Sequence, residues 1–194
     1  MASYDRNTAL LVVDIQNDFA DPAGGLYVRG GEEVVPVANR EAAEARSAGA
    51  LVVHTQDWHP ETTPHFQKDG GVWPVHCVQE TWGAAFHPDL RVEGDILYKG
   101  IGGEDGYSAF SVRDPQSGAT QATQLEGLLK RYGITRVVVL GLATDYCVRE
   151  TALDARRLGL TVEVVQEGIR AVDLQPGDGD RAIQAMEARG VTFV

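Results

Sequence analysis

The sequence predicts an α/β protein, a three-layer α-β-α sandwich with a mostly parallel sheet of about six strands. Short apolar runs, typical of strands buried on both faces, alternate along the chain with amphipathic segments of helical spacing. Parallel neighbouring strands need long crossover connections, and such helices supply them. The 194 residues are enough for one domain with its own core, so we expect a single domain over residues 1–194.

The expected strands are short apolar segments bounded by polar residues or glycine. They cover residues 8–14, 50–56, 95–99, 136–142, 161–166 and 191–194. The expected helices carry apolar residues at helical spacing, and each is followed by a glycine, which favours the left-handed conformation that ends a helix. They cover residues 33–48, 122–132, 145–158 and 178–189.

Composition narrows the classes of partner. The net charge is −11 and no dense Lys/Arg cluster is present, so a nucleic-acid partner is not expected. No apolar run approaches the roughly 20 residues of a membrane helix, and "MASYDRNTAL" lacks the layout of a secretory signal. We therefore expect a cytoplasmic protein with a small-molecule partner and no membrane association. In that compartment Cys77 and Cys147 are expected to be free thiols.

Four chemically useful residues fall at one edge of the predicted sheet. Asp14, Asp57 and Lys99 stand at the ends of the first three strands, and Cys147 follows the strand over 136–142. Ligands of open parallel sheets bind beyond the carboxyl ends of the strands. This edge is therefore the candidate site. The long segment 57–94, which has little periodicity, belongs to it because loops of that length are usually functional.

Cys147 is a candidate nucleophile. Thr144 or Asp145 is the expected N-cap of its helix. A helix N-terminus and a nearby lysine both lower the pKa of a thiol. The alternative is a small buried hydrophobic side chain, as most free cysteines are. Asp14 likewise has two interpretations, a general base or one half of a structural salt bridge to Lys99.

The stretch "QDWHPETTPHF" over 56–66 indicates a metal site. It contains Asp57, His59 and His65, and His76 follows in "WPVHC". Three imidazoles and one carboxylate suit Zn²⁺, Fe²⁺ or Mn²⁺, with Zn²⁺ preferred. The alternative is a set of polar loop histidines. The remaining histidines, His54 and His87, are expected to be structural.

Other catalytic motifs are missing from the sequence. "KGIGGEDG" has neither GxGxxG nor GxxxxGK[ST] spacing, so it indicates a loop that lets backbone approach closely rather than a phosphate cradle. No GxSxG nucleophile elbow occurs.

Together these segments resemble the nicotinamidases, also called pyrazinamidases, of the isochorismatase-like cysteine hydrolases. The matching segments run in family order through most of the chain: "LLVVDIQNDF", "QDWHPETTPHF", "WPVHC", "FHPDL", "YKG", "GYSAF" and "GLATDYCVRETALDA". The resemblance implies a parallel sheet between helices and a catalytic triad of Asp14, Lys99 and Cys147. Many members of this family are oligomers, so the resemblance is compatible with a homo-oligomer.

The resemblance also assigns the surroundings of the triad. Asp57, His59 and His65 match the protein ligands of one divalent metal ion. His76 matches a residue that lies close to that ion and ligates it in some members.

Phe19, Trp73 and Tyr107 match the aromatic walls around the substrate ring. A cis peptide bond before Ala143 is implied, which would direct the N–H groups of Ala143 and Cys147 to an oxyanion.

The implied reaction is hydrolysis of nicotinamide, and of pyrazinamide, through a cysteine thioester, as a step of NAD salvage. The metal would position the ring nitrogen of the aromatic amide. Three alternatives remain. The first is a cysteine hydrolase of another small amide, such as an N-carbamoyl compound or a ureide. The second is a metal-binding interaction protein with an inert cysteine. The third is a vinyl-ether hydrolase of the isochorismatase type, which does not need the metal ligands.

Overall fold

A computed structural model describes residues 2–194, and a six-stranded sheet lies at its centre. Its strands follow the order β3-β2-β1-β6-β7-β8, and every neighbouring pair is parallel. They are β1 (Thr8–Val13), β2 (Leu51–Asp57), β3 (Asp95–Lys99), β6 (Arg136–Leu142), β7 (Thr161–Arg170) and β8 (Thr192–Phe193). The predicted α/β fold with a mostly parallel sheet of about six strands is confirmed.

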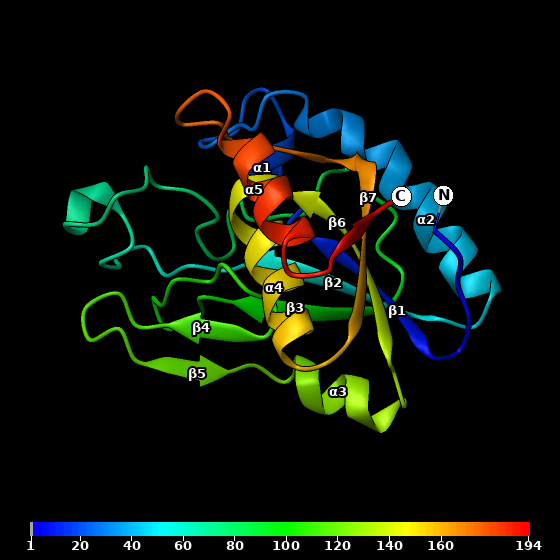
Figure 1. Cartoon of the computed structure of the whole chain (residues 1–194). Coiled ribbons are helices and arrows are strands. Elements are labelled where there is room, and N and C mark those ends of the chain that lie inside the picture. The colour runs from blue at the N-terminus through cyan, green and yellow to red at the C-terminus, as the bar shows by residue number, and fades with distance from the viewer. Residues whose placement is uncertain (1) are drawn as a thin grey trace.

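Helices cover both faces of this sheet (Figure 1). α2 (Val34–Ser47) packs on one face, and α3 (Leu125–Arg131), α4 (Arg149–Arg157) and α5 (Asp178–Glu187) pack on the other. Side chains of a strand alternate between the two faces. In β1, Leu10 and Val12 therefore enter the core beneath α2, whereas Leu11 enters the core beneath the other three helices. The sheet thus separates two hydrophobic cores, and the helices on its two faces complete a sandwich of three layers.

Four helices end as the sequence predicts. Gly49, Gly133, Gly159 and Gly190 lie just beyond α2, α3, α4 and α5, and all four have positive φ. The α-helices themselves are shorter than the predicted segments by a few residues, because terminal turns depart from α-helical geometry.

Several elements were not predicted. β4 (Ser111–Arg113) and β5 (Thr120–Ala122) form a separate antiparallel ribbon, so α3 begins later than the expected residue 122. The short helix α1 (Asn17–Ala20) and two 3₁₀ turns, Gly31–Glu33 and Gln67–Asp69, lie in the connecting segments. Such short elements depend on contacts with the rest of the fold, and local sequence patterns signal them weakly.

The register of the strands places the ends of β1, β2, β3 and β6 side by side at one edge of the sheet. Asp57 pairs with Lys99 at the ends of β2 and β3, and Val13 pairs with Gly141 at the ends of β1 and β6. A side chain at position 141 would meet the Val13 carbonyl oxygen at 2.0 Å, so glycine permits this close approach. Asp14 follows β1 with φ of 49°. None of the helices in residues 2–194 combines the length and the apolar composition that a membrane span requires.

Candidate active site

Lys99 is the central charge of the site. Its Nζ lies 2.7 Å from Asp14 Oδ2, 2.8 Å from Asp57 Oδ1 and 3.8 Å from Cys147 Sγ. It also donates to the carbonyl oxygen of Gly106. The Lys99 side chain is fully buried, and burial by itself lowers the pKa of a lysine. The two carboxylates outweigh that effect and raise the pKa of Lys99 well above its ordinary value, so the ammonium stays charged.

Asp14 has a second partner that sequence reasoning missed. Thr55, in the neighbouring strand β2, donates its hydroxyl to Asp14 Oδ1 at 2.6 Å. Complete burial raises the pKa of Asp14 to about 6, and Lys99 and Thr55 oppose that shift. At neutral pH the carboxylate is ionised, yet its basicity is higher than that of a free aspartate. Asp14 Oδ2 is also bonded to Lys99, so the structural salt bridge is present, and the raised pKa is compatible with the second interpretation, a general base.

Cys147 lies close to this pair. Its sulfur and the carboxylate oxygens of Asp14 and Asp57 are within 4.8 Å of one another. The thiol is 7% exposed at the residue level, and burial raises its pKa well above the ordinary value despite the opposing charge of Lys99. The expected lowering of this pKa by a helix N-terminus is therefore wrong for the structure as it stands. Cys147 rests as a thiol and needs a base before it can act as a nucleophile.

The turn that carries Cys147 differs from the predicted one. Thr144–Val148 is a π-helical turn that precedes α4, and Ala143 occupies its N-cap without a side-chain hydrogen bond. Neither Thr144 nor Asp145 is the cap, so that expectation is wrong. The Asp145 carboxylate instead accepts hydrogen bonds from the backbone N–H groups of Val172 and Asp173, which ties the turn to the segment after β7. The peptide bond between Leu142 and Ala143 is cis, as the resemblance implies.

Three histidines from the long loop form a compact cluster. One ring nitrogen each of His59, His65 and His76 lies within 4.8 Å of the others, and all three residues are buried. Neither nitrogen of His59 has a hydrogen-bond partner among residues 2–194. A buried polar atom without a partner is costly, so this donor set fits a bound cation, which would accept the free electron pairs of the rings. Burial lowers the pKa of His76 to about 3, which keeps its imidazole neutral as metal ligation requires.

Asp57 lies between the histidine cluster and the catalytic pair. Its Oδ2 is 3.6 Å from His59 Nε2, and its Oδ1 is the oxygen next to Lys99. Burial alone would raise the pKa of Asp57, but Lys99 and His59 reverse the effect and place it below the usual range. The structure thus brings together all four metal-ligand candidates, with the carboxylate at the edge of the imidazole cluster.

Hydrogen bonds to the rings leave one nitrogen free on two of the histidines. Nδ1 of His76 contacts the carbonyl oxygen of Pro74 at 2.8 Å. Nδ1 of His65 contacts Oδ1 of Asp105 at 2.6 Å. Sequence reasoning missed Asp105, although it belongs to the glycine-rich segment that was expected to allow close backbone approach. That expectation is confirmed at Gly100, where a Cβ would lie 2.6 Å from the His59 ring.

A cavity opens above the sulfur of Cys147. The predicted aromatic residues Phe19, Trp73 and Tyr107 line it, together with His65, His76 and Ala143. Trp73 donates its indole N–H to the hydroxyl of Tyr107 at 2.7 Å, which holds the two rings together. Sequence reasoning missed Tyr146, which also lines the cavity and meets the Trp73 ring edge-on at 4.8 Å between centroids.

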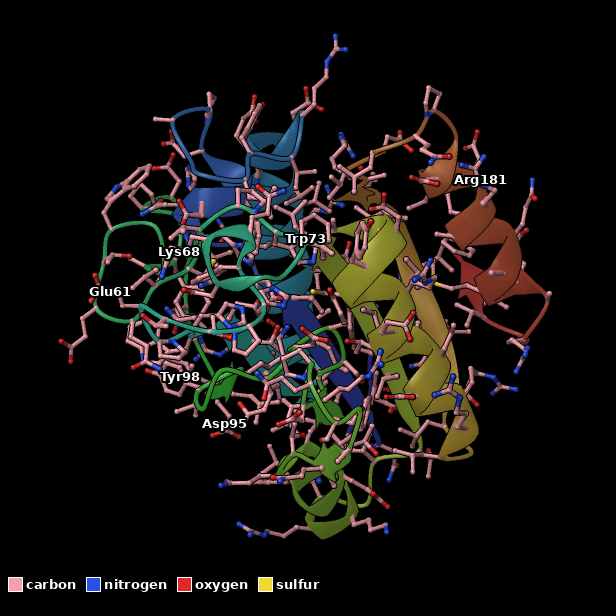
Figure 2. All side chains as sticks on the ribbon, turned by 90° about the vertical axis from the view of Figure 1, so that its left-hand side faces the viewer. Glu61, Lys68, Trp73, Asp95, Tyr98 and Arg181 are labelled. Atoms are coloured by element: carbon pink, nitrogen blue, oxygen red, sulfur yellow. The ribbon has the colours of Figure 1, made fainter. Side chains whose placement is uncertain are left out.

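The loop that forms one wall of the cavity faces the viewer in Figure 2. Glu61 and Lys68 are exposed side chains of this loop, whereas Trp73 lies over the turn before α4, where Tyr146 contacts it (Figure 2). The loop therefore places the charges of Glu61 and Lys68 outside, whereas Trp73 and the three clustered histidines are buried.

The remaining histidines and Cys77 do not line the cavity above Cys147. His54 is fully buried in β2 against the ring of Phe86. His87 Nδ1 accepts from the backbone N–H of Asp89 near the surface. Cys77 is a buried free thiol, and burial raises its pKa well above the ordinary value. These positions agree with the structural roles expected for both histidines.

Known proteins match the chain over nearly its whole length. The isochorismatase domain family matches residues 8–194. A nicotinamidase of Escherichia coli (strain K12) is 40% identical over 203 residues, which covers 95% of this chain and 93% of that protein. The crystal structure of a pyrazinamidase of Pyrococcus horikoshii in complex with zinc aligns with a TM-score of 0.86 at 39% identity, covering 97% of this chain and 98% of that one.

A third comparison has the same outcome. The crystal structure of PnC1 from L. infantum in complex with nicotinate aligns with a TM-score of 0.89 at 34% identity, covering 100% of this chain and 95% of that one. These relatives agree with the chain in sequence and fold over nearly its full length, and the matched residues include every candidate site residue. This agreement identifies the family. The chain belongs to the isochorismatase-domain family, and nicotinamidases are among the relatives that it resembles over most of its length.

Proposed function

We propose that this protein is an amidohydrolase that converts nicotinamide and water to nicotinate and ammonia, and pyrazinamide to the corresponding acid. One observation carries the proposal. A buried thiol, carboxylate and ammonium, those of Cys147, Asp14 and Lys99, lie at one end of an aromatic cavity whose other end holds three imidazoles. The names of the relatives support the substrate class. Nicotinate is a precursor of pyridine nucleotides, so the reaction would serve NAD salvage.

In the first half-reaction, Asp14 accepts the proton of the Cys147 thiol, and the sulfur forms a bond to the amide carbon. The carbonyl π electrons move to oxygen, where the N–H groups of Ala143 and Cys147 would stabilise the negative charge. Removing one such donor typically costs about 3 kcal/mol of transition-state stabilisation. The carbon–nitrogen bond then breaks as Asp14 returns its proton to the departing nitrogen. Ammonia leaves, and a thioester remains.

In the second half-reaction, Asp14 accepts a proton from water, and the hydroxide oxygen attacks the thioester carbon. The carbon–sulfur bond breaks, the acid is released, and Asp14 returns its proton to the sulfur. Acid–base assistance of this kind contributes about 10²–10⁴-fold. The raised pKa of Asp14 supports both directions of transfer, because a group that titrates near 6 can accept and return a proton near neutral pH. Lys99 keeps Asp14 ionised between transfers and lies near enough to stabilise a thiolate.

Asp57, His59, His65 and His76 would hold one divalent metal ion. Their chemistry suits Zn²⁺ first, which the zinc complex of the Pyrococcus horikoshii relative supports, and also Fe²⁺ or Mn²⁺. When bound, the ion supplies a Lewis-acidic anchor for the ring nitrogen of the substrate. The nucleophile is sulfur, so the ion would position the carboxamide rather than generate hydroxide, and positioning is worth several kcal/mol of a barrier.

The aromatic residues of the cavity would hold the flat ring of the substrate. Phe19 lies 5.4 Å from the His76 ring, and Trp73 is fixed by its hydrogen bond to Tyr107. Rigid aromatic walls bury a pyridine or pyrazine ring without much loss of side-chain entropy. They favour a planar heteroaromatic amide over an extended N-carbamoyl compound or ureide, which remains the alternative substrate class.

Ammonia release tests the proposal. Wild-type protein loaded with Zn²⁺ should release ammonia from nicotinamide, and Cys147→Ala should abolish it. Cys77→Ala is the matched control, because Cys77 is also a buried thiol but does not line the cavity. It should retain turnover. Parallel assays with an N-carbamoyl amino acid and a ureide separate the alternative. Turnover that survives in Cys147→Ala would end the proposal.

A further inference from the structure

We infer that Asp105 is a positioning residue of the metal site, one that orients His65 and determines which of its ring nitrogens faces the cation. The inference rests on the metal role proposed above but not on the identity of the substrate. Asp105 is not among the site residues predicted from the sequence, and it does not line the substrate cavity. It acts through His65 alone.

The contact between the two side chains is short and sheltered. Asp105 Oδ1 lies 2.6 Å from His65 Nδ1, and the side chains are 13% and 4% exposed. An ionised carboxylate only accepts hydrogen bonds, so the proton of this pair sits on Nδ1. The proton of a neutral imidazole can occupy only one nitrogen. Nε2 of His65 therefore carries the free electron pair that a cation needs.

The backbone holds Asp105 in place from one side. Its N–H donates to the carbonyl oxygen of Arg113 at 2.7 Å, and its own carbonyl oxygen accepts from the Arg113 N–H at 3.0 Å. This pair of bonds is an isolated antiparallel bridge to Arg113, which lies at the turn end of the β4–β5 ribbon. The backbone of Asp105 is therefore held in place, and its carboxylate reaches His65 from this position.

The next residue holds the same turn against the catalytic lysine. Gly106 accepts a hydrogen bond from Lys99 through its carbonyl oxygen. A side chain at position 106 would lie 2.9 Å from Asp57 Oδ1 and 3.0 Å from Lys99 Cβ, so glycine permits this approach. One dipeptide thus contacts both halves of the site, the histidine cluster through Asp105 and the Lys99–Asp57 pair through Gly106.

His65 is anchored only lightly by its own loop. Its backbone N–H donates to the hydroxyl of Thr63 at 3.1 Å, and Thr63 in turn donates to the carbonyl oxygen of Gly103 at 2.6 Å. These bonds position the backbone of the loop, and the His59 ring stacks on the imidazole at 4.7 Å between centroids, but neither contact determines which ring nitrogen carries the proton. The hydrogen bond that His65 Nδ1 donates to Asp105 is what fixes the proton on that nitrogen and turns the other nitrogen toward the cation. A carboxylate at this position also makes the opposite nitrogen a stronger electron donor.

Zinc affinity measures this role without any turnover. The metal-free protein would be titrated with Zn²⁺ in competition with a chromophoric chelator at pH 7.5. Asp105→Ala should weaken Zn²⁺ binding about 10–100-fold. Asp105→Asn keeps the shape and a neutral acceptor, so it should weaken binding less, yet by more than about twofold. If Asp105→Ala does not fold, the isosteric Asn variant decides the question.

Glu104→Gln is the matched control. Glu104 precedes Asp105, and its carboxylate accepts from the backbone N–H of Gly102 rather than from a histidine. It should bind Zn²⁺ as wild type does. Nitrogen-15 spectra of the imidazoles give a second readout, because the Nδ1–H signal of His65 should be present in wild type and lost in Asp105→Ala. Unchanged affinity in both Asp105 variants, or an equal loss in Glu104→Gln, overturns the inference.

The outcomes separate this inference from the proposed function. If wild type releases no ammonia from nicotinamide while its Zn²⁺ affinity depends on Asp105, the substrate assignment fails and the positioning role stands. If wild type is active while the Asp105 variants bind Zn²⁺ as wild type does, only the positioning role fails.

Discussion

Lys99 forms a buried ion pair with Asp14, with 2.7 Å between Nζ and Oδ2 and neither side chain exposed. The same ammonium lies 2.8 Å from Asp57 Oδ1. Two carboxylates so close together repel each other, and one interposed cation removes that repulsion. A single side chain therefore links the proposed general base to the proposed metal ligand. Changing it should affect stability as well as chemistry.

Lys99→Met should lower both activity and stability. The methionine stem fills similar space but leaves Asp14 and Asp57 buried without a cation. Breaking a buried pair by removing one partner typically costs about 3–5 kcal/mol, so the free energy of unfolding should fall by about that amount. Urea unfolding of the metal-free protein at pH 7.5 measures it. Lys130→Met is the control: Lys130 is 75% exposed and pairs with Glu126 on α3, a pair worth less than about 1 kcal/mol. Equal stability of Lys99→Met and wild type would contradict the account of the ion pair.

The pH dependence of turnover should report Asp14. Its pKa is raised to about 6, so the carboxylate is ionised and able to accept the thiol proton above that pH, and is protonated and inactive as a base below it. The value of kcat/KM should be level above about pH 7 and fall about tenfold per pH unit below about pH 6. Steady-state assays with nicotinamide from pH 5 to pH 8 give the profile. Circular dichroism at each pH verifies that the protein stays folded. A level profile down to pH 5 in folded protein would exclude Asp14 as the base.

Removal of the metal should weaken substrate binding and leave the thiol reactive. Nicotinamide affinity is measured by calorimetry on Cys147→Ala, in which no turnover consumes the ligand. Chelation of the ion should lower that affinity by at least about tenfold, or about 1.4 kcal/mol. Alkylation of Cys147 by iodoacetamide in wild type should proceed at a similar rate with and without the ion, because the sulfur is paired with Lys99 and Asp14 and not with the histidine cluster. Equal nicotinamide affinity in both states would refute the anchoring role.

His54 should make the protein sensitive to acid. Its ring is fully buried, neither nitrogen has a hydrogen-bond partner in residues 2–194, and burial lowers its pKa to about 4. The unfolded chain takes up the proton near pH 6.5, whereas the folded one does so only near pH 4. Stability is therefore lost as the pH falls through that window. His54→Leu should remove on the order of 3 kcal/mol of this loss.

Guanidinium unfolding of wild type and His54→Leu at pH 7.5 and at pH 4.5 provides the comparison. His76, whose pKa is also lowered, remains in both proteins, so the difference between them isolates His54. Parallel losses in the two proteins would show that His54 does not carry the acid sensitivity.

Local pattern predicts most of the framework for a physical reason. Buried parallel strands must be apolar and short, and helices must end where a residue tolerates positive φ, so composition and glycine mark both. The carboxyl ends of such strands share one edge of the sheet. The placement of Asp14, Asp57 and Lys99 at that edge therefore follows once the strands are found. The β4–β5 ribbon escapes prediction because its strands are short and largely exposed, and they carry no apolar alternation.

By itself the sequence determined the α/β class, the candidate residues at the sheet edge and the resemblance that groups them. Only the tertiary structure decided the protonation states and the supporting partners. A helix terminus favours a thiolate at Cys147, but burial outweighs that effect and raises the pKa of the thiol, and burial is a property of the packed fold. Thr55 and Asp105 likewise gain their roles from side chains brought close by folding, 41 and 40 residues away along the chain. Local sequence specifies backbone preference, whereas electrostatics depends on what surrounds a group in three dimensions.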